Sequence, residues 1–407
     1  MHDLPQGILV VGQSGGPTTV MNASLAAVIQ AAQEQPQAIT KIYGLVHGIE
    51  GALNEAFIDL TNISRDELKQ LETTPGAVLG STRYKLTDAE FERVLDVFQK
   101  YGVRYFVYIG GNGSMWVCNH LGELAEQRGY DLRVAGVPKT VDNDLVGTDF
   151  SPGYPSAARF MALVTRDAGR DLEAMATFDD VVILESMGRN TGWLAAASAL
   201  LKQNKDEAPH LVYVPEIPFD EDSFIGDVSG VHQRLGYCFV VVAEGLRDEN
   251  GNFIGLSDAH KDSLGRPILH LSNGVGAYLA GRVRERLGLQ TRCLRPGLIG
   301  RSLSECTTRF DRLAAHTAGT YAVIDLMRGH NQIMVALRHE FSVENIHSIG
   351  QAVLPLSDIH SHEKRLSHEY MNDAGNMTTQ AFSDYALPLI GEVPPLVRLN
   401  ALQVAKR

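Results

Sequence analysis

Two carboxylates and a lysine lie within residues 138–144 of the chain. Asp142 and Asp144 are two residues apart with Asn143 between them, and Lys139 stands three residues before the first carboxylate. An acid pair beside a lysine suits proton abstraction, metal chelation and the handling of a charged phosphoryl group. Aspartate and asparagine are also ordinary turn residues, so this stretch alone leaves a plain polar turn open as the alternative.

The elements before this loop indicate how it is positioned. The apolar run at residues 134–137 predicts a short buried strand that ends in the loop. In open α/β sheets, ligands bind in the loops at the carboxyl ends of the strands. The acidic loop is therefore expected at the ligand-binding edge of a sheet.

Two glycine-rich loops follow other predicted strands. Residues 8–11 predict a buried strand that runs into a loop at 12–19 and then a helix. Residues 105–109 predict another strand, which feeds Gly-Gly-Asn-Gly-Ser at 110–114. Free N–H groups and the helix dipole at such a junction form an anion site. The first loop lacks the Gly-Lys-Ser/Thr ending of a Walker A sequence, and a tight turn without a ligand is its alternative interpretation.

Arginines stand out at two places in an otherwise acidic chain. Residues 74–83 form a loop of small residues closed by Arg83, and residues 291–301 contain Arg292, Arg295 and Arg301. Guanidinium groups suit phosphate binding, although each could also be a solvated surface cation.

Composition excludes some classes of function. The net charge of −12 argues against non-specific nucleic-acid binding, which needs a basic surface. No apolar stretch approaches a membrane span and the N-terminus lacks a signal-peptide pattern, so we expect a soluble, cytoplasmic protein that binds neither nucleic acid nor membrane. The length of 407 residues and the alternating strands and helices predict an α/β fold of two Rossmann-like, three-layer lobes with mostly parallel sheets.

Taken together, these loops resemble the phosphofructokinase family, from Gly12 to about Ile390. The matching pieces come in the family's order: Gly15-Gly16-Pro17 with Met21-Asn22, residues 79–83, 110–114 and 138–144, Met187-Gly188-Arg189, Pro215-Glu216 and residues 291–301. Each glycine loop alone is a weak signal, whereas the combination is highly specific. The sequences of the loops are similar to those of the branch that contains pyrophosphate-dependent and related ATP-dependent enzymes.

The resemblance implies a 6-phosphofructokinase, which transfers a phosphoryl group to the 1-hydroxyl of fructose 6-phosphate with Mg²⁺ as cofactor. It implies a donor-binding lobe at residues 1–150, a sugar-phosphate-binding lobe at 151–325 and a C-terminal segment at 326–407 that packs back on the lobes. The implied roles are Asp142 as general base with Lys139 and Arg83 at the transferred phosphoryl group; Gly15, Gly16, Gly111, Gly113 and Ser114 for the donor; Thr140, Asp144, Met187, Gly188, Arg189, Glu216, Arg292 and Arg301 for the sugar phosphate; and Asn112 for the metal. In the family, the arginine that matches Arg292 comes from a neighbouring subunit, so a homodimer or homotetramer with shared active sites is expected.

Lys139 and Gly113 indicate different phosphoryl donors. Lys139 is typical of pyrophosphate-dependent members, but those usually have aspartate at the position of Gly113, where it takes the place of the nucleotide's α-phosphate. Glycine together with lysine resembles ATP-using relatives. We therefore expect ATP as the donor, with pyrophosphate as the alternative.

The acceptor is open in a similar way. Leu298 and Gly300 replace a histidine or tyrosine and a glutamine of the family, and Asp180 stands where bacterial ATP-dependent enzymes have an arginine. We expect fructose 6-phosphate, with another sugar phosphate or a polyol as the alternative. A non-catalytic regulatory subunit is a third possibility, against which the retained charged residues weigh.

Overall fold

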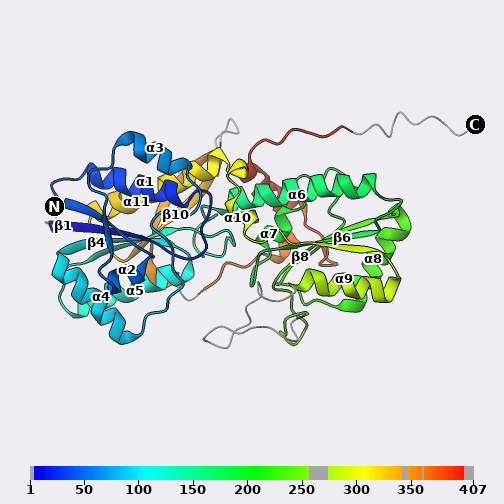
Figure 1. Cartoon of the computed structure of the whole chain (residues 1–407), viewed down its shortest axis with the longest axis horizontal. Helices are drawn as coiled ribbons and strands as arrows, with labels where there is room; N and C mark the ends of the chain where they lie inside the picture. The colour runs from blue at the N-terminus through cyan, green and yellow to red at the C-terminus, as the bar shows by residue number, and fades with distance from the viewer. Residues whose placement is uncertain (1–3, 256–273, 342–346, 360–361, 398–407) are drawn as a thin grey trace, which may run out of the picture.

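The computed structural model describes residues 4–255, 274–341, 347–359 and 362–397. These residues form two lobes, each built around a sheet covered by helices (Figure 1). The predicted α/β class with mostly parallel sheets is confirmed. Among the described residues, no helix combines the length and apolarity that crossing a bilayer requires.

The first lobe has a seven-stranded sheet in the order β11-β10-β5-β4-β1-β2-β3. Neighbouring strands from β10 to β2 are parallel, and β11 and β3 are antiparallel at the edges. The strands are β1 Gly7–Gln13, β2 Ile39–Leu45, β3 Phe57–Asp59, β4 Val103–Gly110, β5 Arg133–Pro138, β10 Ile333–Phe341 and β11 His347–Pro355. The three loops that the sequence singles out follow β1, β4 and β5, which are neighbours in the sheet.

Helices cover both faces of this sheet because its central strands are apolar on both sides. Leu9 and Val11 pack in the core that α1 and α11 cover, whereas Val10 packs in the core beneath α4 and α5. The helices of this lobe are α1 Met21–Gln33, α2 Ile49–Leu53, α3 Arg65–Thr73, α4 Asp88–Tyr101, α5 Asn112–Gln127 and α11 Arg309–Met327.

The second lobe has a parallel four-stranded sheet in the order β7-β8-β6-β9. Its strands are β6 Val181–Ser186, β7 Leu211–Tyr213, β8 Cys238–Ala243 and β9 Thr291–Leu294. The remaining helices are α6 Tyr154–Ala174, α7 Trp193–Ala197, α8 Glu221–Leu235, α9 Gly274–Leu287, α10 Ile299–Ser302 and α12 Gln380–Ala386, with 3₁₀ turns at Ser304–Cys306, Leu356–Asp358, His368–Tyr370 and Leu387–Ile390.

The helix α11 lies in the first lobe, although the predicted domain boundary at residue 325 assigns most of it to the second lobe. Residues 309–325 were expected with the second lobe, but α11 packs against α1 of the first lobe. The Ser24 hydroxyl donates a hydrogen bond to the carbonyl of Ala315 (3.0 Å), and Gly319 has no side chain to keep the two helices apart. Periodicity reveals which face of a helix is apolar but not which sheet it covers, so the boundary at 325 was wrong for this helix.

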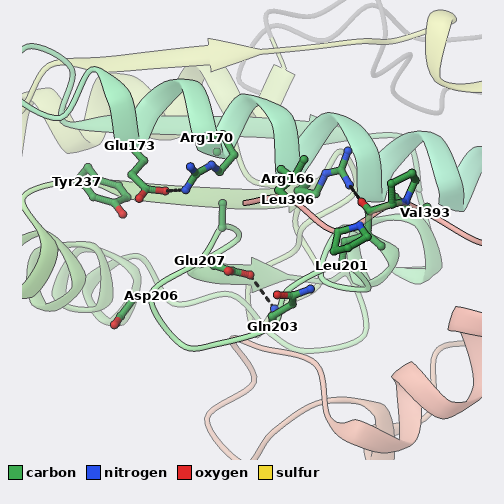
Figure 2. Close-up of a pocket in the computed structure, with 14 residues that line it drawn as sticks. Arg166, Arg170, Glu173, Leu201, Gln203, Asp206, Glu207, Tyr237, Val393 and Leu396 are labelled. Carbon is green, nitrogen blue, oxygen red and sulfur yellow. Dashed lines mark hydrogen bonds and ion pairs between the residues drawn. The ribbon is translucent and has the colours of Figure 1, made fainter. Parts of the chain in front are cut away.

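The last described residues run along α6 of the second lobe. Arg166 donates a hydrogen bond to the carbonyl of Pro394 (3.0 Å), and this contact borders a pocket between α6, the loop at 201–208 and residues 393–396 (Figure 2). None of the predicted site residues lines this pocket.

Candidate active site

The loop after β5 is fixed at its start by two backbone hydrogen bonds. The Lys139 N–H donates to the carbonyl of Gly110 at the end of β4 (3.0 Å), and the Thr140 N–H donates to the carbonyl of Pro152 (3.2 Å). The Thr191 hydroxyl, from the second lobe, donates to the carbonyl of Asp142 (3.0 Å). The acidic loop therefore belongs to the first sheet and is held from the second lobe as well.

Asn143 forms a left-handed turn between the two carboxylates. Its φ is 53° and its side chain is fully buried. A left-handed residue costs about 1–2 kcal/mol, and asparagine tolerates it better than most residues. The Ser151 N–H donates to Asn143 Oδ1 (3.0 Å) and Asn143 Nδ2 donates to Tyr385 Oη (2.8 Å), each worth about 0.5–1.5 kcal/mol. These bonds offset the cost and give the turn one conformation.

Three buried oxygens at this turn have no hydrogen-bond partner among the described residues. They are Oδ1 of Asn112, Oδ1 of Asp142 and Oδ1 of Asp144. The Nδ2 group of Asn112 donates to the other carboxylate oxygen of Asp144 (3.0 Å), which ties the start of α5 to the acidic loop. Buried acceptors are normally satisfied, so these oxygens are suited to hold a ligand.

The Oδ1 atoms of Asn112 and Asp144 fit a hard divalent cation, which leaves Oδ1 of Asp142 free. Mg²⁺ is usually bound by one or two carboxylates together with phosphate oxygens of a substrate. In the described residues, no group of three or more histidine, cysteine, aspartate or glutamate side chains forms a complete metal cage. The oxygens of Asn112 and Asp144 would be part of an open set of ligands that a bound phosphate completes.

The two carboxyl groups hold their protons more tightly than exposed aspartates. Burial is the largest cause for each, and the nearby Asp144 and Glu244 carboxylates further raise the pKa of Asp142. The Lys139 ammonium and the Arg301 guanidinium lower the pKa of Asp142. A carboxyl group with a raised pKa and a free oxygen is suited to act as a general base near neutral pH.

Lys139 lies beneath the first glycine-rich loop. Its side chain is buried, and Nζ donates to the carbonyl of Gly16 (2.9 Å). Gly15 has φ 78°, and a Cβ placed on it would lie 3.0 Å from Lys139 Nζ. Burial lowers the pKa of Lys139 to about 8, with Arg301 and Arg83 acting in the same direction and the carboxylates of Asp142 and Asp144 opposing it. A buried ammonium beside a glycine loop is a strong anion site.

Arg301, on α10, also reaches this loop. Its guanidinium contacts Gly16 so closely that a Cβ on the glycine would overlap it. Burial lowers the pKa of Arg301, and the charge of Arg83 lowers it further. Arg83 itself is exposed and follows Thr82, whose carbonyl accepts a hydrogen bond from the Gly15 N–H (3.1 Å). The structure thus brings Arg83 and Arg301 to the predicted donor loop.

The second glycine-rich loop forms the start of α5. Gly111 precedes the helix and lies close to the carbonyl of Lys139, 3.6 Å from a Cβ built on it. Ser114 is buried against Gly110. Gly113 is exposed, and a Cβ at this position would meet no atom within 4 Å. The α5 N-terminus therefore offers open space at Gly113 beside the metal-type oxygens.

The second lobe contributes residues from the carboxyl ends of β6 and β8. Met187, Gly188 and Arg189 follow β6, and Gly188 has φ 131° with Thr191 too close to allow a side chain. Glu244 follows β8, and burial raises its pKa, as does the charge of Glu185. Sequence reasoning did not select Glu244, although an acid directly after a buried strand was the available signal.

Two predicted substrate residues, Arg292 and Glu216, bind other groups of the protein. Arg292 is at the start of β9, where its Nε pairs with Asp179 (2.8 Å), and β9 begins at the edge of the sheet opposite the loop after β6. Glu216 accepts hydrogen bonds from the N–H groups of Gly192 (3.0 Å) and Leu366 (2.9 Å) through Oε1. Its Oε2 is buried without a partner among the described residues, so one acceptor is available to a ligand.

Comparison with known proteins identifies the family of this fold and site. The family model described as phosphofructokinase matches residues 8–326. The chain belongs to the phosphofructokinase family. It is 37% identical to pyrophosphate–fructose 6-phosphate 1-phosphotransferase of Xanthomonas campestris, with 96% of this chain and 93% of the relative covered. It is 36% identical to a sulfofructose kinase of Alkalicoccus urumqiensis, with 82% and 84% covered.

A solved structure agrees over the same length. The pyrophosphate-dependent phosphofructokinase of Marinobacter aquaeolei superimposes with a TM-score of 0.84 at 36% identity, covering 96% of this chain and 94% of that chain. The phosphofructokinase resemblance of the loops is confirmed, and so is the expectation of a phosphotransferase.

Proposed function

We propose that this phosphofructokinase transfers a phosphoryl group from a phosphoanhydride to the 1-hydroxyl of fructose 6-phosphate. The observation that carries the proposal is the position of Asp142: a half-buried base with a buried, free oxygen, next to Lys139 under the Gly15–Gly16 loop. In-line phosphoryl transfer requires a positioned base, neutralisation of developing charge and a cradle for the donor. Each requirement has a residue at this site.

The residues divide the work as follows. Asp142 accepts the proton of the acceptor hydroxyl. The hydroxyl oxygen then attacks phosphorus, and the P–O bond to the leaving phosphate breaks. Lys139 and Arg301 stabilise the charge on the transferred group and the leaving phosphate. Asn112 and Asp144 would hold Mg²⁺, which when bound neutralises charge on the donor phosphates. Glu244 and the turn at 187–189 face the acceptor sugar from the second lobe.

Pyrophosphate is the better supported donor. The printed names of the Xanthomonas campestris relative and of the Marinobacter aquaeolei structure both specify pyrophosphate, and both cover almost the full chain. These comparisons weigh against the sequence expectation of ATP. ATP remains a second candidate because Gly113 leaves open space and adds no charge where an aspartate would repel a nucleotide.

A Gly113→Asp variant separates the two donors. The new carboxylate would repel the α-phosphate of ATP, and ATP-dependent turnover should fall about tenfold or more, whereas pyrophosphate-dependent turnover should stay within about threefold. Folding should not suffer, because an acid is favourable at a helix N-terminus and no atom lies near the new Cβ. Steady-state rates with each donor would measure this.

Gly226→Asp, at an exposed glycine on α8, is the matched control. It should leave both donor reactions unchanged. An equal loss of both reactions in Gly113→Asp would contradict a donor-selecting role for this position.

Fructose 6-phosphate is the acceptor named for the Xanthomonas campestris relative, and sulfofructose is the sugar in the name of the Alkalicoccus urumqiensis relative. Both sugars carry an anionic group. Leu298, which replaces a polar family residue, is 66% exposed, so the anion contact is left to other residues of the site. Parallel assays with fructose 6-phosphate, sedoheptulose 7-phosphate and sulfofructose would decide between the acceptors.

We further propose that Arg292 completes the site of a neighbouring subunit in a homo-oligomer, because within its own chain it pairs with Asp179. An equimolar mixture of Arg292→Ala and Asp142→Asn subunits, dissociated and reassembled, should regain about one quarter of wild-type activity, since half the dimers would hold one intact site. Light scattering would establish the oligomeric state. Reassembled mixed dimers without activity would contradict a shared site.

A further inference from the structure

A short C-terminal segment, residues 363–366, contacts three loops of the site. We call it the C-terminal strap. Asn190, just after the 187–189 turn, donates from Nδ2 to Oε1 of Glu363 (3.0 Å). The Leu366 N–H donates to Glu216 Oε1 (2.9 Å). The strap lies beyond residue 326, where the match to the phosphofructokinase family model ends.

Lys364 joins the strap to the acidic loop. Its backbone N–H donates to the carbonyl of Asp144 (2.7 Å). Its Nζ donates to Asn143 Oδ1 (3.3 Å) and to the carbonyls of Thr148 (3.1 Å) and Asp149 (2.9 Å). An ammonium group has three donors, so these three oxygens use its full capacity.

Lys364 is also anchored in the second lobe. Trp193 Nε1, at the start of α7, donates to the carbonyl of Lys364 (3.0 Å). The ammonium lies 5.0 Å from the centroid of the Trp193 ring, within the range of a cation–π contact. Lys364 therefore bridges the Asn143 turn of the first lobe and the first turn of α7.

A second C-terminal residue holds the same turn. Tyr385 Oη accepts from Asn143 Nδ2 (2.8 Å) and donates to the carbonyl of Asp149 (2.7 Å). The side-chain amide of Asn143 is thus held on one side by Lys364 and on the other by Tyr385, both from outside its own loop.

We propose that Lys364 and Tyr385 are positioning residues for phosphoryl transfer, which hold the Asn143 turn so that the flanking carboxylates keep their catalytic geometry. This inference rests on the proposed function of Asp142 and Asp144. Neither residue touches the reacting atoms. Their effect comes through Asn143, whose left-handed conformation fixes the directions in which the chain enters and leaves the turn.

The test compares Lys364→Met and Tyr385→Phe with two controls. Lys205→Met removes an exposed ammonium elsewhere, and Tyr370→Phe alters a ring that stacks on Tyr385 with centroids 5.7 Å apart. Small displacements of catalytic groups cost up to about 10²-fold in rate, so kcat should fall at least tenfold in Lys364→Met and about threefold in Tyr385→Phe. The KM for the sugar phosphate should stay within about threefold, because substrate contacts remain.

Hydrogen exchange gives a readout that does not need activity. Amides of residues 139–149 should exchange faster in Lys364→Met and Tyr385→Phe than in the wild type and the controls. If the wild type has no phosphofructokinase activity, the proposed function fails while hydrogen exchange still tests whether the strap orders the turn.

Two outcomes would overturn the proposal. One is a folded Lys364→Met enzyme with wild-type kcat and exchange rates, even if its melting temperature is lower, since that would mean a structural role only. The other is an equal loss of kcat in the controls. If Lys364→Met does not fold, an unchanged kcat in Tyr385→Phe overturns the proposal by itself.

Discussion

Replacing Asp142 by asparagine should lower kcat by about 10²–10⁴-fold, the usual contribution of a general base. Asparagine keeps the size of the side chain and an oxygen that can bind a cation, but it cannot accept the proton of the acceptor hydroxyl. The KM for the sugar phosphate should change little, because the lost interaction is made in the transition state. Initial rates across substrate concentrations with the better donor would measure both constants.

Asp66→Asn is the matched control, since the side chain of Asp66 is 89% exposed on α3. It should behave as the wild type. A folded Asp142→Asn enzyme that retains wild-type turnover would remove Asp142 from the role of base and would favour a different proton acceptor at the site.

Replacing Lys139 by methionine should lower kcat by about 10²–10³-fold, the effect of losing one preorganised charge stabiliser. Methionine fills the same buried space beside Gly16 without the ammonium. The wild type should also show a fall of kcat/KM as the pH rises through about 8, because burial lowers the pKa of Lys139 to about 8 and only the charged form stabilises phosphate. The variant should lose this alkaline limb.

Lys41→Met, at an exposed lysine on β2, is the control and should keep both the rate and the alkaline limb. If Lys139→Met kept the alkaline limb with a reduced rate, another group would be responsible for it. If Lys139→Met kept the full rate, the ammonium would have no part in catalysis.

The sequence was enough to place the first-lobe candidate residues near one another, for a physical reason. Gly15, Asn112 and Asp142 each follow a strand, and β1, β4 and β5 are adjacent and parallel. Carboxyl ends of adjacent parallel strands meet at one edge of a sheet, so local strand-to-loop signals sufficed to bring these residues together.

Residues from elsewhere were harder to place. Arg301 reaches Gly16 from α10 only because of how the two lobes pack, and no spacing in the sequence encodes that contact. The resemblance to the family selected Arg301 for the sugar phosphate and did not predict its contact with Gly16. Glu244 could have been selected from the sequence, because it is an acidic residue directly after the buried strand β8.

Lys364 carried no local signal. It is a single lysine in a polar C-terminal stretch, and its Nζ contacts are with oxygens of Asn143, Thr148 and Asp149, more than 200 positions earlier. Long-range polar contacts of this kind depend on the tertiary fold and have no periodicity to read.

The most direct test of the proposed activity is an assay of purified protein with Mg²⁺, fructose 6-phosphate and either pyrophosphate or ATP, followed by ³¹P NMR. The proposal predicts fructose 1,6-bisphosphate as the product, formed faster with pyrophosphate, and its loss in Asp142→Asn. Absence of the bisphosphate with both donors, from protein that is folded and correctly assembled, would contradict it.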